Sequence, residues 1–192
     1  SAVSWFYPDW DAALAERLDG TTWHKPICEV GDARALSEKD APLPLWPASV
    51  DRVITSPPYL GTYDYAVHHE RRFSWLDIDP QTVFAKEMAS RRHGEATPIK
   101  QLVEQHERET AAWVRGVARV LRPGGRMFVI VGDSAVRGHA LSGDTPIRTA
   151  CEKAGLHFVA RASAERPPLP DNVVSVEDGA PPPPRYEHLL EF

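Results

Sequence analysis

The most constraining feature of this sequence is a long amphipathic segment between two apolar, β-branched runs. The first run, Val50 to Ser56, meets two consecutive prolines, which cannot continue a sheet ladder. The second run, Met127 to Val131, is continuously apolar, as is typical of a fully buried parallel strand. From Pro98 to Leu121, apolar residues recur at every third or fourth position, which predicts a helix packed against a sheet.

Further strand and helix signals continue this alternation. We expect helices at Pro8–Leu18 and Asp144–Ala154, strands at Ile27–Val30 and His157–Ala162, and a last strand at Tyr186–Phe192 that pairs antiparallel with its predecessor at the sheet edge. The sequence Asp144-Thr145-Pro146 is expected to cap the second helix. Two helical pieces, 65–76 and 80–89, form a helical insertion over 60–97, and residues 167–184 form a Pro-rich loop. The alternation predicts an α/β fold with a doubly wound, mostly parallel sheet.

Composition excludes several classes of protein. The 192 residues are 42% hydrophobic and 26% charged, which is ordinary for one soluble domain. No run of about 18 apolar residues is present, and the first residues do not form a basic flank followed by an apolar stretch. We therefore expect neither a membrane span nor a secretory signal, and a cytoplasmic protein.

Metal and disulfide chemistry are not indicated. Cys28 and Cys151 are far apart, with no CxxC spacing, which predicts neither a disulfide framework nor a zinc site. His68 and His69 are adjacent, so on a helix they point in different directions and do not ligate one metal. We expect no bound metal.

The charge distribution leaves two interpretations open. A net charge of −5 argues against coating nucleic acid through net charge. Positive charge is nevertheless concentrated in the middle of the chain, at Arg71, Arg72, Arg91, Arg92 and His93. These residues form either a local basic face for a polyanion or an ordinary solvated helix surface.

The sharpest chemical signal is Ser56-Pro57-Pro58-Tyr59, directly after an apolar strand. Active sites of open α/β sheets lie beyond the carboxyl ends of their strands. Two prolines fix the backbone and present carbonyl groups with no competing N–H, which holds hydrogen-bond acceptors in place. The structural alternative is a Pro-Pro turn that only ends the strand, with Tyr59 filling a gap.

Ser-Pro-Pro-Tyr at this position resembles the catalytic tetrapeptide of the S-adenosylmethionine-dependent methyltransferases that modify exocyclic amino groups, chiefly of cytosine or adenine in DNA. Four other segments resemble motifs of that family in the same order: its loop after the third strand, its turn before the fifth strand, the end of that strand and its last strand, at Gly31–Arg34, Val120–Gly125, Gly132–Ser134 and Glu187–Leu190. The resemblance covers residues 27–192. It implies a class I, Rossmann-like methyltransferase fold, of which strands three to seven are present.

The resemblance also implies roles for single residues. Ser56 and the carbonyl of Pro57 would accept hydrogen bonds from the target amine, and Tyr59 would stack on the target base. A base inside a duplex cannot reach such a pocket, so it must be flipped out or come from a single strand. Asp32 would hydrogen-bond the adenine amino group of the cofactor, S-adenosylmethionine, with Ala33 and Ser56 beside it; its alternative role is that of a turn aspartate.

Four further residues are candidates for substrate contact. The aromatic rings of Tyr63 and Tyr65 suit a wall that grips a base or the cofactor, or they pack the loop onto the next helix. Asp133, after a buried strand, either lines the substrate pocket or is part of an ordinary turn. Arg166 lies in the loop after the sixth strand, where the resemblance suggests substrate contact.

Two motifs of the family have no counterpart here. Nothing before Trp23 resembles a strand followed by a glycine-rich turn, and no acidic residue follows a second strand. The chain therefore resembles the C-terminal half of a longer enzyme, a single partial catalytic domain over residues 1–192. A truncation, a partner subunit that supplies the first two strands, and a loss of cofactor binding each explain this.

We expect the exposed sheet edge to pair with a second copy or with a partner chain. DNA is favoured over RNA as the substrate, at cytosine N4 or adenine N6, and a protein substrate ranks lower. The alternative of a different class is a non-catalytic, methyltransferase-like module that binds nucleic acid or a partner subunit.

Overall fold

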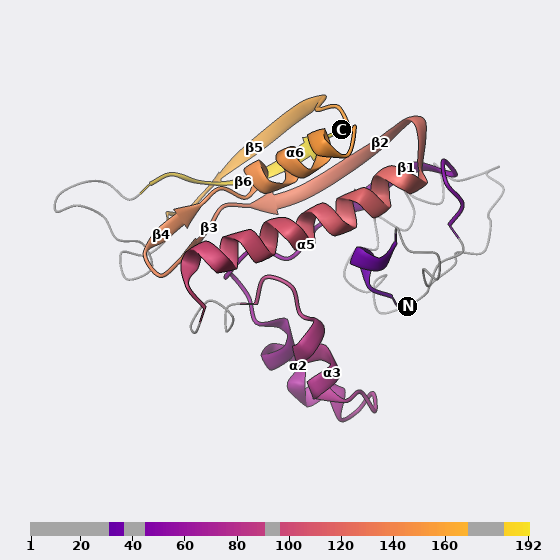
Figure 1. Ribbon diagram of the computed structural model, residues 1–192. Helices are drawn as coiled ribbons and strands as arrows, with labels where there is room; N and C mark the ends of the chain where they lie inside the picture. Colours follow the sequence, from indigo (N-terminus) through magenta and orange to yellow (C-terminus); the bar gives the residue numbers. More distant parts are fainter. Residues whose placement is uncertain (1–30, 37–44, 91–96, 169–182) are drawn as a thin grey trace, which may run out of the picture. The chain divides into compact units, whose positions relative to one another are not determined.

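A four-stranded sheet with two helices packed against it forms the main part of the structure (Figure 1). The computed structural model describes residues 31–36, 45–90, 97–168 and 183–192, which belong to one compact unit, Gly31–Phe192. The elements are a 3₁₀ turn at Ala33–Ala35, β1 (Val50–Thr55), α2 (Tyr65–Phe73), α3 (Pro80–Lys86), α5 (Ile99–Val120), β2 (Leu121–Gly132), β3 (Ser134–Val136), β4 (His139–Leu141), α6 (Asp144–Lys153), β5 (Ala160–Arg166) and β6 (Arg185–Glu191).

The sheet has the order β1-β2-β6-β5. β1 pairs parallel with β2, whereas β6 pairs antiparallel with both of its neighbours, so β1, β2 and β5 point in one direction and β6 in the other. The α/β class expected from the sequence is confirmed. The last two strands form the expected antiparallel pair, with β5 at the edge.

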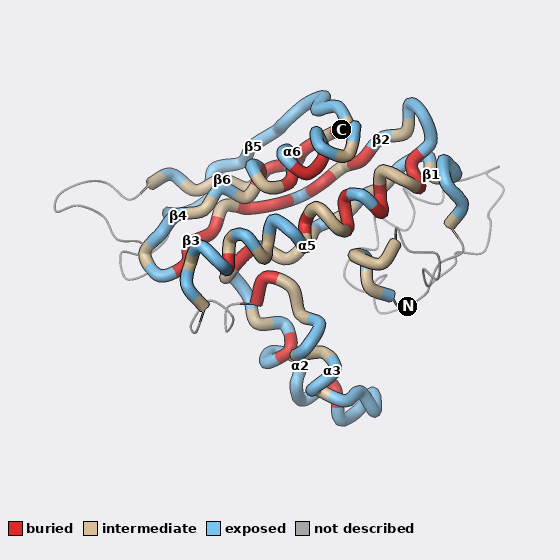
Figure 2. Tube along the Cα trace, viewed as in Figure 1, coloured by how far each residue is buried: buried red, intermediate tan, exposed pale blue. Residues whose placement is uncertain are grey.

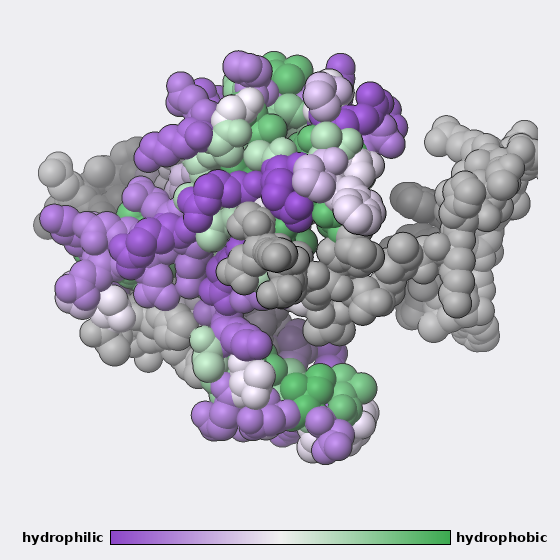
Figure 3. Space-filling view, turned by 45° about the vertical axis from the view of Figure 1, so that its right-hand side comes forward, coloured by the Kyte–Doolittle hydropathy of each residue, from purple (hydrophilic) through white to green (hydrophobic). Residues whose placement is uncertain are grey.

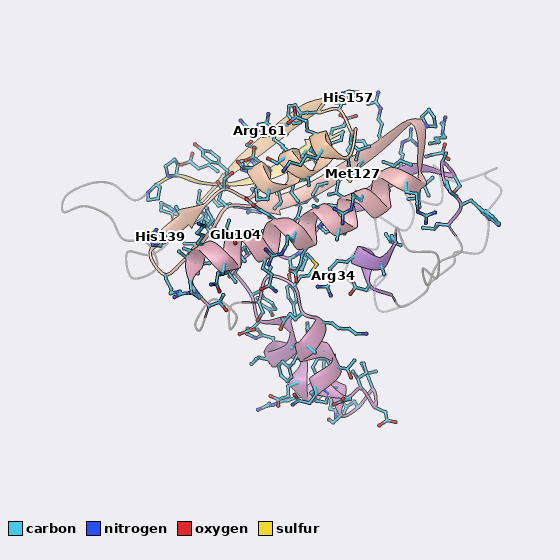
Figure 4. The ribbon with its side chains drawn as sticks, viewed as in Figure 1. Arg34, Glu104, Met127, His139, His157 and Arg161 are labelled. Atoms are coloured by element: carbon cyan, nitrogen blue, oxygen red, sulfur yellow. The ribbon has the colours of Figure 1, made fainter. Side chains whose placement is uncertain are left out.

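The core lies between the sheet and the pair α5 and α6. Figure 2 shows the buried residues following one side of α5 and alternate positions of β2. Met127, labelled in Figure 4, and Val129 of β2 are fully buried against Val114 of α5 and Ile147 of α6. Burial of each such side chain contributes about 1.5–3 kcal/mol before chain entropy is subtracted.

The opposite face of the sheet carries apolar side chains that the described helices do not cover. Ile130 and Leu189 are register partners on β2 and β6, and they are 40% and 43% exposed; Ile54 of β1 is 76% exposed. Among the described strands, β1 also pairs on one side only. Association with a second copy or a partner chain at this edge stays a prediction.

β2 follows α5 directly, and a glycine turn lies within the first residues of this strand. The helix stops at Val120, and Gly124 adopts a positive φ of 75°, which favours glycine. The parallel register passes from Val50↔Leu121 to Arg52↔Arg126, so the turn forms a bulge against β1. The helix and the strand lie where the sequence predicted them, but the helix ends one residue earlier, at Val120, and the residues expected to form the turn belong to β2, which begins at Leu121 rather than at Met127.

The helices α2 and α3 lie within the expected insertion 60–97. Asp79 begins α3 by accepting a hydrogen bond from the Gln81 N–H at 3.0 Å, next to Pro80 at the first helical position. Trp75 and Leu76, in the connection between the two helices, are 88% and 65% exposed. In Figure 3, hydrophobic residues gather on one side of this helical segment, next to hydrophilic ones.

Two local expectations need correction, and one hairpin was not expected. β5 begins at Ala160 rather than His157, because its ladder with β6 starts at Ala160↔Glu191. Gly143, not Asp144, is the N-cap of α6, and the Asp144 carboxylate binds side chains instead. The hairpin of β3 and β4 was not expected; its turn is formed by a residue with positive φ followed by a glycine.

Some expectations fall on residues outside the described ranges. These are the helix at 8–18, the strand at 27–30, the basic residues 91–93 and the Pro-rich stretch 169–182. None of the described helices combines the length and the hydrophobicity that crossing a membrane requires. In the described part of the chain, no group of three or more potential ligand residues could hold a metal ion.

Candidate functional site

The tetrapeptide lies directly beyond the carboxyl end of β1. The strand ends at Thr55, Ser56 is exposed, and the two prolines and Tyr59 are half-buried. β2 runs parallel to β1 and ends at Gly132. The carboxyl ends of two neighbouring parallel strands therefore meet here, at the sheet edge where open α/β folds bind ligands.

Gly132 leaves the space that the Tyr59 ring occupies. A Cβ atom at Gly132 would lie 2.8 Å from a ring carbon of Tyr59 and 3.2 Å from the next one, closer than carbon atoms approach each other. Any other amino acid would displace the ring. The glycine at the end of β2 is thus required by the position of Tyr59.

The hydroxyl of Tyr59 is anchored at a second point. It donates a hydrogen bond to Oε1 of Glu187 on β6 at 3.1 Å. Arg166, the last residue of β5, forms an ion pair with Oε2 of the same carboxylate. The expected substrate residue Arg166 and the expected base-stacking residue Tyr59 are therefore joined through Glu187.

The protonation states agree with this network. Burial raises the pKa of Tyr59 most strongly; a hydrogen bond with the Ser56 side chain lowers it, and the hydrogen bond to Glu187 raises it again, so that the net shift is upward. The hydrogen bond from Arg166 lowers the pKa of Glu187. At neutral pH, Tyr59 is consequently a protonated donor and Glu187 an ionised acceptor.

A cavity of about 200 Å³ adjoins the tetrapeptide. Its walls include Pro57, Pro58 and Tyr59, His106 of α5, and Ser142 and Thr145 at the start of α6. Burial lowers the pKa of His106, so its imidazole is neutral near pH 7, and its Nδ1 has no hydrogen-bond partner among the described residues. The cavity combines apolar walls with a few polar groups, as binding sites for small planar ligands do.

Tyr63 and Tyr65 form an aromatic group just after the tetrapeptide. Their ring centroids are 4.5 Å apart in an edge-to-face arrangement, and Tyr63 stacks on His68 at 4.3 Å. The two tyrosines are 38% and 43% exposed. They pack with each other and with α2 and still present ring surface to solvent, so both interpretations made from the sequence remain compatible with their positions.

Asp32 precedes the 3₁₀ turn, and Ala33 is its first residue. The Asp32 carboxylate accepts a hydrogen bond from the Arg34 N–H at 2.9 Å and pairs with the Arg34 guanidinium at 2.6 Å. These bonds lower the pKa of Asp32, and its side chain is 35% exposed. Figure 4 shows Arg34 beside α5, where it also pairs with Glu109 at 3.1 Å.

Asp133 binds the protein's own backbone. Its Oδ1 accepts a hydrogen bond from the Gly143 N–H at 2.9 Å, and its Oδ2 accepts one from the Tyr186 N–H at 3.0 Å. His188 lies 3.4 Å from Oδ1. These contacts join the end of β2 to the starts of α6 and β6, which is a structural use of a residue expected at the substrate pocket.

Reasoning from the sequence did not identify Glu187, Gly132 or His106 as site residues. Glu187 and Gly132 belong to two of the segments that resemble family motifs, and His106 lies within the long amphipathic segment Pro98–Leu121. In the structure, Gly132 and Glu187 are register partners on adjacent strands. A predicted register between the last strand and β2 is the signal that would have found them.

No protein-family model matches the sequence, and the search of curated proteins finds no match. The solved structures that are similar to it include three of one protein from Thermus thermophilus that is provisionally described as a DNA modification methylase. The selenomethionine derivative is 26% identical with a TM-score of 0.43, a second structure 27% with 0.45, and a complex with S-adenosyl-L-methionine 27% with 0.49. The alignments cover 84% of this chain and 49%, 51% and 52% of the other, so this chain spans about half the length of the protein it matches.

Proposed function

We propose that this chain carries the catalytic loop of an S-adenosylmethionine-dependent methyltransferase that acts on an exocyclic amino group of a nucleobase, cytosine N4 or adenine N6 in DNA. One observation carries the proposal. Ser56-Pro57-Pro58-Tyr59 lies at the carboxyl end of β1, and the Tyr59 ring is fixed against Gly132 at the carboxyl end of the neighbouring parallel strand. This is where an α/β sheet supports a reaction.

The residue types suit the nucleophile. An exocyclic amine is a poor nucleophile because its lone pair is delocalised into the base ring. Acceptors that bind its hydrogens let the nitrogen become more tetrahedral and localise the lone pair. The exposed Ser56 hydroxyl and the carbonyl of Pro57 are such acceptors, and proline rigidity holds them without reorganisation during the reaction.

Asp32 and Ala33 would meet one end of the cofactor. The pKa of Asp32 is lowered by Arg34, so the carboxylate is ionised, and a third of its side chain is exposed. Both of its oxygens already accept hydrogen bonds from Arg34, so an adenine amino group would share the carboxylate with that side chain. Ala33, beside it, offers no bulky side chain. When bound, S-adenosylmethionine supplies a methyl group attached to positively charged sulfur. The described part of the chain holds no strand followed by a GxG turn, the motif expected to hold its methionine end.

The target base requires an aromatic platform and a small enclosure. Stacking on an aromatic ring is worth about 1–3 kcal/mol per base and tolerates any base identity. Tyr59 offers a ring whose plane is fixed by Gly132 and Glu187, next to a cavity of about 200 Å³. Such a platform holds a base taken out of the helical stack.

The test is methyl transfer from S-adenosylmethionine with a tritiated methyl group, offered to duplex DNA, single-stranded DNA and RNA, followed by mass spectrometry of the nucleosides. We expect N4-methylcytosine or N6-methyladenine from DNA. Ser56→Ala should reduce the rate by about 10²-fold or more through loss of an acceptor at the reacting amine. Ser74→Ala, which changes an exposed serine after α2, is the matched control and should leave the rate unchanged.

Other outcomes would redirect the proposal. Modification of RNA alone would contradict the choice of DNA and keep the reaction. Cofactor binding in calorimetry without transfer to any nucleic acid would refute the nucleobase substrate. Absence of both cofactor binding and transfer, in the full natural protein that contains this chain, would favour a non-catalytic binding module.

A further inference from the structure

We propose that Glu187, held by Arg166, is a positioning residue that fixes Tyr59 and with it the Ser56–Tyr59 loop for the reaction. The inference rests on the proposed function and deepens it. It assigns the last strand of the sheet a task in orienting the target base, with the carboxylate acting through the tyrosine hydroxyl rather than on the reacting atoms.

The contacts make Glu187 a bridge between two elements. One carboxylate oxygen accepts a hydrogen bond from the Tyr59 hydroxyl at 3.1 Å, and the other is bound by the Arg166 guanidinium. Each oxygen therefore has its own donor. Because Arg166 occupies the second oxygen, the carboxylate cannot rotate away from Tyr59 without breaking the ion pair.

The register explains why the hydroxyl reaches this carboxylate. Gly132 of β2 and Glu187 of β6 lie directly opposite each other in the antiparallel ladder. The Tyr59 ring occupies the space beside Gly132, so its hydroxyl lies next to Glu187, which is opposite Gly132 in the ladder. The ring is thus held by van der Waals contact at its side and by a hydrogen bond at its tip.

Two attachment points set the plane of the ring. A tyrosine packed at one side can still tilt, whereas a hydrogen bond at the tip removes that freedom. A base that stacks on the ring inherits its plane, and a displacement of about 1 Å at a reacting group can cost about 10²-fold in rate. Glu187 would therefore affect the rate of transfer more than the stability of the protein.

A surface ion pair without function is the competing explanation. The Arg166 and Glu187 side chains are 51% and 29% exposed, and an exposed pair of this kind contributes about 0–1 kcal/mol to stability. Such a pair would not depend on the Tyr59 hydroxyl. A double-mutant cycle between Glu187 and Tyr59 distinguishes the two explanations.

The cycle compares the wild type, Glu187→Ala, Tyr59→Phe and the double variant in the methyl-transfer assay. We expect each single change to lower kcat by about tenfold or more, with a smaller effect on KM. The double variant should be no slower than the slower single variant, because both changes remove the same contact. Glu187→Gln keeps an oxygen acceptor and should recover part of kcat. Glu165→Ala, which removes a neighbouring exposed carboxylate on β5, is the matched control and should match the wild type.

A second readout does not depend on activity. Glu187 raises the pKa of Tyr59, so Glu187→Ala should lower it. Tyrosinate absorbance near pH 10 measures this shift when the titration of the matching Tyr59→Phe protein is subtracted. Effects on kcat that multiply in the double variant, or an unshifted Tyr59 titration, would overturn the inference and leave the proposed function standing. A wild type that transfers no methyl group would refute the proposed function and the positioning role together.

Discussion

Replacement of Asp133 tests whether its carboxylate holds the fold together. In Asp133→Ala, the backbone N–H groups of Gly143 and Tyr186 lose acceptors at 2.9 and 3.0 Å. A hydrogen bond to a charged group contributes about 1.5–3 kcal/mol, and water reaches part of this site because the side chain is 19% exposed. We therefore expect a loss of about 3 kcal/mol in the free energy of unfolding.

This loss should be visible in two measurements. For a domain of this size, about 3 kcal/mol corresponds to a decrease in Tm of roughly 6–12 °C. With a urea m-value of about 3 kcal/mol/M, the midpoint should fall by about 1 M. In Asp133→Asn, one oxygen still accepts a hydrogen bond, but the amide NH₂ group faces the other backbone N–H. This variant should therefore lose at least half as much free energy of unfolding as Asp133→Ala.

Asp51→Ala is the matched control for this prediction. Asp51 pairs with Arg122 at the surface and its side chain is 68% exposed, so its removal should cost less than about 1 kcal/mol. Equal destabilisation by Asp51→Ala and Asp133→Ala would refute the structural role of Asp133. Unchanged stability of Asp133→Ala together with weaker nucleic-acid binding would favour the substrate contact expected from the sequence.

Three further outcomes follow from buried groups. Burial raises the pKa of Asp144, but hydrogen bonds from its neighbours lower it by more, to below its usual value of 3.8; its ionised form therefore stabilises the fold above about pH 4, and the difference in urea midpoint between wild type and Asp144→Asn should shrink as the pH falls from 5 to 3. Burial raises the pKa of Cys151 to about 12, so in a Cys28→Ser protein the thiol should not react with Ellman's reagent at pH 8 until urea unfolds the chain; rapid reaction of the folded protein would contradict this. Gly132→Ala should cost about 1–3 kcal/mol in stability, a loss that a second change, Tyr59→Ala, relieves; a persistent loss would show that the ring is not the obstacle.

Most elements were predictable because their signals are local. The stripe of α5 and the apolar run of β2 depend on residues a few positions apart, and the proline pair marks the end of β1. Asp79 and Pro80 begin α3 as their types predict. The predictions that were wrong concern positions where contacts between distant residues determine the local structure. The start of β5 is set by its pairing with β6, and Asp144 does not cap α6 because Arg161 and Ser142 bind its carboxylate.

In the candidate site, too, some residues were predictable from the local sequence and others were not. The tetrapeptide is recognisable because it follows a strand within one continuous segment. The partners of Tyr59 are not, since Glu187 is 128 positions away and reaches it only through the placement of β6 between β2 and β5. That placement is a choice among strand orders, which residue patterns within single strands do not determine.

The position of β6 also accounts for the residue types around Tyr59. An antiparallel strand beside β2 brings its first residues to the carboxyl ends of β1 and β2, because it runs in the opposite direction. Glu187 therefore lies at the same sheet edge as the tetrapeptide, although it belongs to the start of its strand. The Glu187 carboxylate accepts a hydrogen bond from the Tyr59 hydroxyl, and Arg166 at the end of β5 neutralises the charge of this carboxylate. The reversed strand thus supplies charged support to a loop whose own residues are uncharged.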